Sequence, residues 1–365
     1  MTVSTETDVN KFLNSIELEV VGQPLGKIAR VLDVDVSEDS VSAKIELGIP
    51  ASSRMDSLRA QIESQLCAHT GVSSAAVELS TNIISHSVQS NLKPIPGIKN
   101  IIAIASGKGG VGKSTVASNI ALALAAEGAS VGVLDADIYG PSQPQMLGLT
   151  GQQPGSEDGE TMEPLIGHGL QVMSIGFLVD PDQPMIWRGP MVTSALQQLI
   201  NQTKWQDLDY LIVDMPPGTG DVQLTMSQQV PVSGAVIVTT PQDIATLDAR
   251  KGLAMFKKVK IPVLGVIENM STHVCTSCGH EEPIFGTGGG EKMVADFEIP
   301  MLGQLPLDAR IREQTDSGNP TVISDPDSAT AAIYRATAIR IAAAQASQRT
   351  DYSSKFGTIV VEGTS

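Results

Sequence analysis

The sequence predicts an α/β domain with a mainly parallel sheet and helices on both faces, preceded by a small α+β domain. From Ile101 onward, short apolar runs alternate with amphipathic segments, which is typical of buried parallel strands and the helices that cover them. Before residue 90 the runs instead alternate apolar and polar residues, as strands with one buried face do. A glycine-rich stretch, SGKGGVGKST, lies between one apolar run and a helical segment and is the strongest functional signal in the chain.

Residues 1–90 are predicted to form the small α+β domain. The stretches IARVLDVDVS and VSAKIELGIP predict two strands joined at EDS, and SAAVELSTNII predicts a third. A helix is expected from about Met55, because apolar residues recur there at spacings of three and four. Cys67 lies one residue past that apolar stripe, where a lone cysteine most often serves packing.

The remaining chain divides into three parts. Residues 91–98 are predicted to be a linker, since the stretch around them contains two prolines and no periodicity. Residues 99–345 form the larger domain, with strands predicted at NIIAIAS, SVGVLDAD, YLIVDMP, GAVIVTT and PVLGVIENM. Residues 346–365 are polar except for GTIVV, which predicts a tail or one added edge strand.

The composition restricts the classes of function. Hydrophobic residues make up 41% of the chain and charged residues 18%, so a sizeable core is expected. The net charge of −16 argues against nucleic-acid binding and against binding to an anionic membrane surface. The N-terminus has no basic segment followed by an apolar run, so no secretory signal is predicted and a cytoplasmic location is expected.

The glycine-rich stretch matches the pattern G-x-x-x-x-G-K-[ST] at Gly107, Gly112, Lys113 and Ser114. Glycines let successive backbone N–H groups surround a phosphate, and the lysine reaches the β- and γ-phosphate oxygens. The serine hydroxyl is the expected ligand for Mg²⁺. The residues predicted to bind ATP here are Gly107, Lys108, Gly109, Gly110, Val111, Gly112, Lys113, Ser114 and Thr115.

Acidic residues follow two further predicted strands. Asp214 ends the run YLIVD, where a carboxylate can hold Mg²⁺ through water, and it is counted with the nucleotide-binding residues. Asp135 and Asp137 end the run VGVLDAD, and Asp137 is predicted to orient the attacking water or assist the metal. Three aspartates after apolar strands, in a chain with this glycine-rich loop, are best explained as one site. The predicted catalytic residues are Lys108, Lys113 and Asp137.

The stretch HVCTSCGH places Cys275 and Cys278 two residues apart. In a reducing compartment such a pair more often binds metal or acts catalytically than forms a structural disulfide. Four thiolates from two chains would suit a [4Fe–4S] cluster or a tetrahedral zinc ion. His273 and His280 keep open a Cys₂His₂ zinc site within one chain, and a thiol redox pair is a further reading.

The motif KGGVGKST resembles the deviant Walker A sequence of Min and Par ATPases, arsenite-pump ATPases and the nitrogenase iron protein, all P-loop NTPases. Within that group the chain is most similar to the Mrp/ApbC iron–sulfur cluster carriers, over about residues 99–325. The stretches that carry the similarity include DADIYGPSQPQML, WRGPM, DMPPGTGD, GVIENMSTHVCTSCGH and IFGTGGGEKM. The N-terminal unit resembles, more weakly, a small iron–sulfur assembly domain, without the cysteine common before its helix. We therefore assign that unit no metal-binding or catalytic role of its own.

This resemblance implies a mechanism. Lys108 would reach the nucleotide of the partner subunit in a homodimer, and Asn269 would contact the base. Cys275 and Cys278 would bind a [4Fe–4S] cluster between the two subunits. The implied function is an ATP hydrolase that receives the cluster from scaffold proteins and transfers it to apo-proteins. Trp187 and Arg188, in WRGPM, match a family motif and are candidates for the interface.

Two other functions share this predicted fold. A Min/Par-like positioning ATPase would use the cysteine pair for structural zinc, and those proteins use an amphipathic membrane helix or a basic DNA-binding face. Here the tail carries few cations and no helical apolar stripe, and the chain as a whole is acidic. A reductase like the nitrogenase iron protein would draw its cluster ligands from well-separated cysteines, unlike the pair found here.

Overall fold

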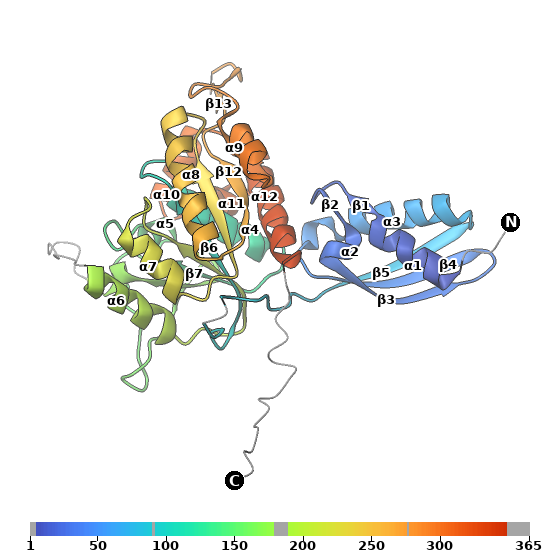
Figure 1. Cartoon of the computed structure of the whole chain (residues 1–365), viewed down its shortest axis with the longest axis horizontal. Helices are drawn as coiled ribbons and strands as arrows, with labels where there is room; N and C mark the ends of the chain where they lie inside the picture. Colours follow the sequence, from blue (N-terminus) through green and yellow to red (C-terminus); the bar gives the residue numbers. More distant parts are fainter. Residues whose placement is uncertain (1–4, 90–91, 179–188, 276, 349–365) are drawn as a thin grey trace, which may run out of the picture.

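The computed structural model describes residues 5–89, 92–178, 189–275 and 277–348. A small N-terminal domain and a larger α/β body lie side by side, joined by one connecting segment (Figure 1). In this part of the chain no helix combines the length and the hydrophobicity that a membrane span requires.

The α/β body is built on an eight-stranded sheet in the order β15-β12-β11-β6-β10-β7-β9-β8. Its neighbouring strands are parallel except for the edge pair β8 and β9. Each of the five predicted strands of this domain is present, which confirms the mainly parallel sheet. The strands are β6 (Ile98–Ser106), β7 (Val131–Asp135), β8 (Leu165–Gly167), β9 (Leu170–Ser174), β10 (Leu208–Asp214), β11 (Gly234–Thr239), β12 (Val263–Glu268) and β15 (Met301–Gln304).

Helices cover both faces of the sheet, as predicted. One face is covered by α4 and α12, which also pack against each other, and the other by α8 and α9 (Figure 1). Helix α4 is buried nearly all round and rich in Ala and Leu, because it lies between the sheet and α12. The helices of this body are α4 (Lys113–Ala126), α5 (Gln143–Met146), α6 (Gly189–Asn201), α7 (Asp221–Gln229), α8 (Asp243–Lys258), α9 (Gly289–Phe297), α10 (Ala309–Asp316), α11 (Thr321–Ser324) and α12 (Ala329–Ala346), with a 3₁₀ turn η2 (Ile175–Phe177).

The N-terminal domain contains the predicted strands and helix. Strands β3 and β4 form an antiparallel hairpin, and β5 pairs with β4 in parallel. Helix α3 buries Leu58, Ile62 and Leu66 of the predicted stripe. The elements are α1 (Glu6–Ser15), β1 (Glu17–Leu18), β2 (Gln23–Pro24), α2 (Leu25–Ile28), β3 (Ala29–Val36), β4 (Ser40–Leu47), η1 (Ser52–Arg54), α3 (Met55–Thr70) and β5 (Ser74–Thr81).

The segment that precedes the predicted linker already contacts the α/β body. His86 is buried, and its Nδ1 lies 2.8 Å from Oδ1 of Asn100 on β6. The Asn100 amide also donates to the carbonyl of Ile84, at 2.9 Å. Burial lowers the pKa of His86 below its usual value, so the neutral ring is favoured in this contact.

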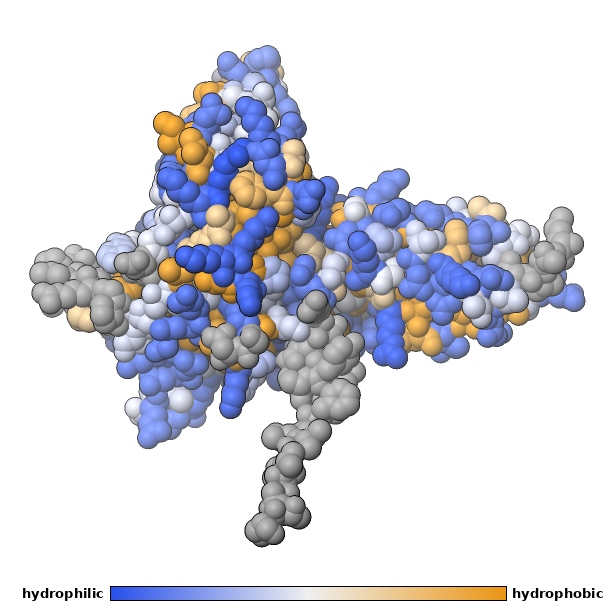
Figure 2. Space-filling model, in the orientation of Figure 1, coloured by the Kyte–Doolittle hydropathy of each residue, from blue (hydrophilic) through white to orange (hydrophobic). Residues whose placement is uncertain are grey.

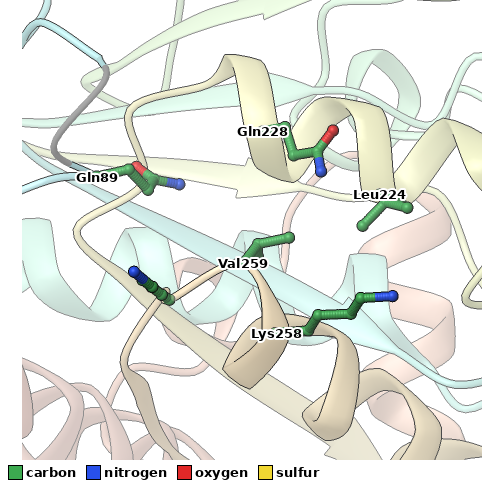
Figure 3. A pocket seen from close by; sticks show the side chains of 6 residues that line it. Gln89, Leu224, Gln228, Lys258 and Val259 are labelled. Atoms are coloured by element: carbon green, nitrogen blue, oxygen red, sulfur yellow. The ribbon is translucent and has the colours of Figure 1, made fainter.

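Further along this segment, Gln89 donates from Nε2 to the carbonyl of Ser227 near the end of α7, at 2.9 Å. It borders a hollow of about 420 Å³ between α7 and the C-terminal end of α8, with Leu224, Gln228 and Lys258 (Figure 3). The C-terminal ends of these helices lie where the strands begin, at the opposite end of the sheet from the carboxyl ends of the strands. The hollow is therefore remote from the glycine-rich loop.

The junction between the two domains centres on Glu127, the residue that follows α4. Its carbonyl accepts hydrogen bonds from the backbone N–H of Ser52 at 3.2 Å and from the Ser52 hydroxyl at 2.8 Å. Its carboxylate accepts from the Ser53 N–H at 2.9 Å and from the Ser53 hydroxyl at 2.7 Å. Gly128 is needed beside this contact, because a Cβ there would lie 2.6 Å from the Ser52 hydroxyl.

We expect Glu127→Ala to loosen the junction, because the N–H and hydroxyl of Ser53 would lose a charged acceptor. A hydrogen bond to a charged group contributes roughly 1.5–3 kcal/mol. The measurement is the rate at which a protease of low specificity, such as proteinase K, cleaves the full chain between its two domains, and this rate should rise. Glu38→Ala, in the exposed β3–β4 turn, is the control. Equal cleavage rates in the Glu127→Ala variant and the parent would contradict this role.

Candidate nucleotide and cysteine site

The carboxyl edge of the sheet brings the predicted site residues together. In the parallel register, Asp214 at the end of β10 lies opposite Asp135 of β7 on one side and Ile104 of β6 on the other. The glycine-rich loop follows β6 directly, and Asn269 follows β12. Aspartates from separate parts of the sequence therefore surround the start of α4.

The glycine-rich loop needs glycine for two physical reasons. Gly110 and Gly112 have φ of +83° and +78°, a left-handed conformation that side chains disfavour. Gly107 lies against α8, where a Cβ would come within 2.1 Å of the Asp248 backbone. Gly112 is also the N-cap of α4 and offers no capping side chain, so the first-turn N–H groups are suited to an anion.

Lys113 lies at the centre of a buried charge cluster. Its side chain is 5% exposed, and its Nζ donates to Oδ1 of Asp214 in a very short contact. The same nitrogen lies 3.7 Å from Asp137 Oδ2 and 3.2 Å from the Ser114 hydroxyl. Ser114, Asp137 and Asp214 supply the oxygen ligands that Mg²⁺ prefers, so this donor set fits the ion.

Asp135 has a different position from Asp137. It is fully buried, and it accepts hydrogen bonds from the backbone N–H of Asp137 at 3.2 Å and from the Ser174 hydroxyl at 3.0 Å. Burial and the nearby Asp214 raise the pKa of Asp135 to about 7. Burial also raises the pKa of Asp137, but that side chain lies closer to Lys113 and is partly exposed. Asp135 therefore shapes the loop that presents Asp137.

Gln143, which the motif analysis did not single out, is buried at the same place. Its Nε2 donates to Oδ2 of Asp214 at 2.9 Å and to the Ser114 carbonyl at 3.1 Å. Its Oε1 accepts from the Ser118 hydroxyl at 2.9 Å. In the sequence, Gln143 is marked only by its place in the stretch DADIYGPSQPQML, which begins with Asp135.

Two other predicted residues of the loop are more accessible. Lys108 and Thr115 are half-buried, and the Lys108 carbonyl accepts from the Ser106 hydroxyl at 2.9 Å. Lys108 forms none of the salt bridges found in the described part of the chain, in contrast to Lys113. The two lysines of the motif therefore have different surroundings.

Asn269 joins the glycine-rich loop to the strand that leads to the cysteines. Its Nδ2 donates to the carbonyl of Val111 at 2.9 Å. A Cβ at Gly112 would lie 2.4 Å from the same nitrogen, so the loop approaches this side chain closely. Met270 follows with a left-handed φ of +58°, and the cysteine hairpin begins at His273.

The cysteines lie at the tip of a small hairpin formed by β13 (His273–Val274) and β14 (Glu281–Glu282). The turn is closed by the Cys275 N–H, which donates to the His280 carbonyl at 2.9 Å, and by Gly279, whose φ is +71°. Backbone N–H groups of Ser277 and Cys278 lower the pKa of the Cys275 thiol. Cys275 is half-buried, Cys278 is exposed, and both are free thiols. The turn therefore favours a thiolate, the form that binds metal.

The histidines beside the cysteines do not complete a metal site within the described residues of one chain. Nδ1 of His273 lies 3.1 Å from the Leu307 carbonyl, and His280 is exposed. Among the residues that the structure describes, no group of three or more His, Cys, Asp or Glu side chains is placed to hold an ion. Trp187 and Arg188, predicted as interface candidates, lie outside the described residues.

The sheet, the glycine-rich loop and the charge cluster define a P-loop NTPase. Residues 97–342 match the model of the NUBPL iron-transfer P-loop NTPase family, and residues 6–79 match that of an iron–sulfur cluster assembly protein family. The chain belongs to the iron–sulfur cluster carrier family of P-loop NTPases. This membership implies nucleotide hydrolysis and confirms the resemblance seen in the sequence.

Two relatives with iron–sulfur cluster names are similar to this chain over most of its length. The iron–sulfur cluster carrier protein of Escherichia coli (strain K12) is 54% identical over 306 residues, covering 84% of this chain and 83% of the relative. The iron–sulfur cluster transfer protein NUBPL of Mus musculus is 51% identical over 264 residues, covering 72% of this chain and 82% of the relative.

Among solved structures, the Archaeoglobus fulgidus nucleotide-binding protein in complex with ADP has a TM-score of 0.55 and is 37% identical, covering 61% of this chain and 87% of that one. The Pyrococcus furiosus cell division ATPase MinD has a TM-score of 0.50 at 23% identity, covering 66% of this chain and 98% of that one. The second likeness is one of fold alone.

The charge cluster predicts strong coupling between Lys113 and Asp214. Lys113→Met should lower the free energy of unfolding by roughly 3 kcal/mol, because it leaves buried carboxylates without their cation. The double variant Lys113→Met/Asp214→Asn should lose less than the sum of the single variants. Urea unfolding of the four proteins measures this coupling. Lys251→Met, which breaks an exposed pair with Asp248, is the control and should cost under about 0.5 kcal/mol. Additive losses would contradict the coupling.

Proposed function

We propose that this protein is an ATP-binding and ATP-hydrolysing carrier that holds a [4Fe–4S] cluster between two copies of the chain and transfers it to apo-proteins. The cluster is its cargo, received from scaffold proteins. The observation that carries the proposal is the hydrogen bond from Asn269 to the Val111 carbonyl, since it links the P-loop to the segment that leads to Cys275 and Cys278. Nucleotide bound at the P-loop and a cluster bound at the cysteines would thereby contact segments that are joined through Asn269.

The cysteine hairpin supports a cluster shared by two chains. Each chain offers two free thiols at an accessible turn, and its own histidines are directed elsewhere or exposed. A [4Fe–4S] cluster takes four thiolates, so a two-fold axis through the hairpins would complete its ligands. An exposed site at the tip of a hairpin also suits a cargo that must leave.

Exposed apolar side chains support a homodimer whose interface borders the nucleotide. Ile244 and Leu247, near the start of α8, are 70% and 58% exposed, and Tyr139 is 63% exposed. Hydrophobic surface is visible over the upper end of α8 in Figure 2. The same helix packs against Gly107 through Asp248, so this surface adjoins the P-loop. A partner seated there would bring its own Lys108 toward the nucleotide.

For hydrolysis, Lys113 would exchange Asp214 for the β- and γ-phosphate oxygens, and Lys108 of the second chain would add positive charge. Asp137 would accept a hydrogen bond from the attacking water, for which its position beside Lys113 is suitable. Mg²⁺, held by Ser114 and assisted by Asp214, would neutralise charge on the phosphates. Asn269 would contact the base while its amide keeps the Val111 carbonyl in place.

ATP binding and cluster binding would be coupled if ATP binds more tightly to one packing of the two subunits than to another. If ATP favours one packing of the two subunits, it changes the geometry of a cluster site built from both of them. The cluster must then change the affinity for ATP by the same factor. The N-terminal domain, docked at the far end of α4, belongs to the same connected body.

Anaerobic reconstitution with iron and sulfide tests the cargo. We expect about four irons per dimer with a brown chromophore, and loss of both in the double variant Cys275→Ala/Cys278→Ala. Cys67→Ala is the matched control and should load iron normally, because Cys67 lies on α3 of the other domain. One tightly held zinc per chain without a chromophore would overturn the cluster and favour the positioning-ATPase alternative.

Sedimentation analysis with ATP tests the dimer surface. Leu247→Asp should weaken dimer formation by roughly tenfold or more, because a charge would be buried in an apolar contact. Ile166→Asp is the matched control, since Ile166 is 63% exposed on the edge strand β8, far along the sheet from β6. The proposed interface is wrong if both variants dimerise as the parent does.

A further inference from the structure

Gln143 makes three side-chain hydrogen bonds inside the candidate nucleotide site. One buried amide joins the start of α4, through the Ser114 carbonyl and the Ser118 hydroxyl, to the Asp214 carboxylate at the end of β10. The side chain is fully buried, and its two N–H groups and its oxygen are all partnered. A glutamine in such a place does more than fill space, because an apolar side chain of the same size would remove the hydrogen bond to Oδ2 of the buried Asp214.

The two oxygens of Asp214 have different partners. Oδ1 accepts from Lys113, whereas Oδ2 accepts from Gln143 at 2.9 Å. An ammonium group is a point charge on a flexible chain and does not fix the plane of a carboxylate. The amide of Gln143 is planar and is held at two points on α4, so its N–H restricts the position of Oδ2 of Asp214. If Lys113 moves to a bound phosphate, the hydrogen bond from Gln143 to Oδ2 would still orient the Asp214 carboxylate.

We propose that Gln143 is a positioning residue that holds the Asp214 carboxylate in register with Ser114, and so sets the affinity of the site for Mg²⁺ together with nucleotide. This inference rests on the proposed function, in which Ser114 and Asp214 serve the metal. It assigns to Gln143 a role in metal-dependent binding, separate from binding of the nucleotide itself.

The backbone at this position is anchored independently of the side chain. The N–H groups of Ser142 and Gln143 both donate to Oδ2 of Asp135, at 3.0 and 3.1 Å. Substituting the side chain therefore leaves the loop attached to β7. This separation makes a side-chain variant interpretable, since the contacts that place residue 143 do not depend on its amide.

The test is nucleotide binding by the full chain, measured with a fluorescent ADP analogue, first in EDTA and then over a range of Mg²⁺ concentrations. Gln143→Met removes the amide at similar length. We expect the Mg²⁺ concentration at half-effect to rise roughly tenfold, with metal-free affinity changed less than about twofold. The matched control is Gln145→Met, two residues along on α5, where the amide reaches only the exposed Asp316 carbonyl at 3.3 Å.

Three outcomes would count against the proposal. An unchanged Mg²⁺ requirement in Gln143→Met overturns it, and equal losses with and without metal show a general packing defect instead. If the parent protein itself binds nucleotide without any dependence on Mg²⁺, both this role and the assignment of Asp214 fall. Iron loading of Gln143→Met should equal that of the parent, which separates a failure at this residue from a failure of the cluster site.

Discussion

The buried pair between Lys113 and Asp214 is the interaction on which the rest of the site depends. Parallel pairing of β6, β7 and β10 brings Asp135, Asp137 and Asp214 together at one edge of the sheet, where buried carboxylates need a nearby cation. The lysine offers the cation that these carboxylates need. In the proposed function the same lysine binds phosphate, so nucleotide binding would exchange one buried ion pair for another. This exchange would give the nucleotide a direct effect on Asp214 and its neighbours.

From this centre, contacts lead in two directions. Asn269 follows β12 and donates a hydrogen bond to the glycine-rich loop. Only three residues separate it from His273, where the cysteine hairpin begins. In the other direction, α4 extends from Lys113 to Ala126, and the next residue, Glu127, accepts hydrogen bonds from Ser52 and Ser53 of the N-terminal domain. In the proposed function, a change at the P-loop would reach both the cysteine hairpin and the N-terminal domain through these contacts.

Local patterns were sufficient to predict much of this arrangement. The buried strands, the P-loop and the β3–β4 hairpin follow from apolar runs, glycine spacing and alternation, all of which act within about ten residues. Helix α1 was not predicted, although Thr5 and Asp8 form a capping box and Val9 and Leu13 are buried one turn apart. That signal was available in the sequence. Gln143, Asn269 and Glu127 differ, because their contacts arise from segments far apart in the chain. Only the assembled sheet reveals that Gln143 bonds to Asp214.

The central claim is that the nucleotide site governs the cluster site. The most direct measurement is the rate of cluster transfer from the reconstituted dimer to an apo-acceptor protein, with ATP, with ADP and without nucleotide. The account predicts that ATP changes this rate in the parent protein, and that Lys113→Met, loaded with the same amount of iron, transfers at one rate under all three conditions. A parent protein whose transfer rate ignores nucleotide, or a Lys113→Met variant that still responds to ATP, would contradict it.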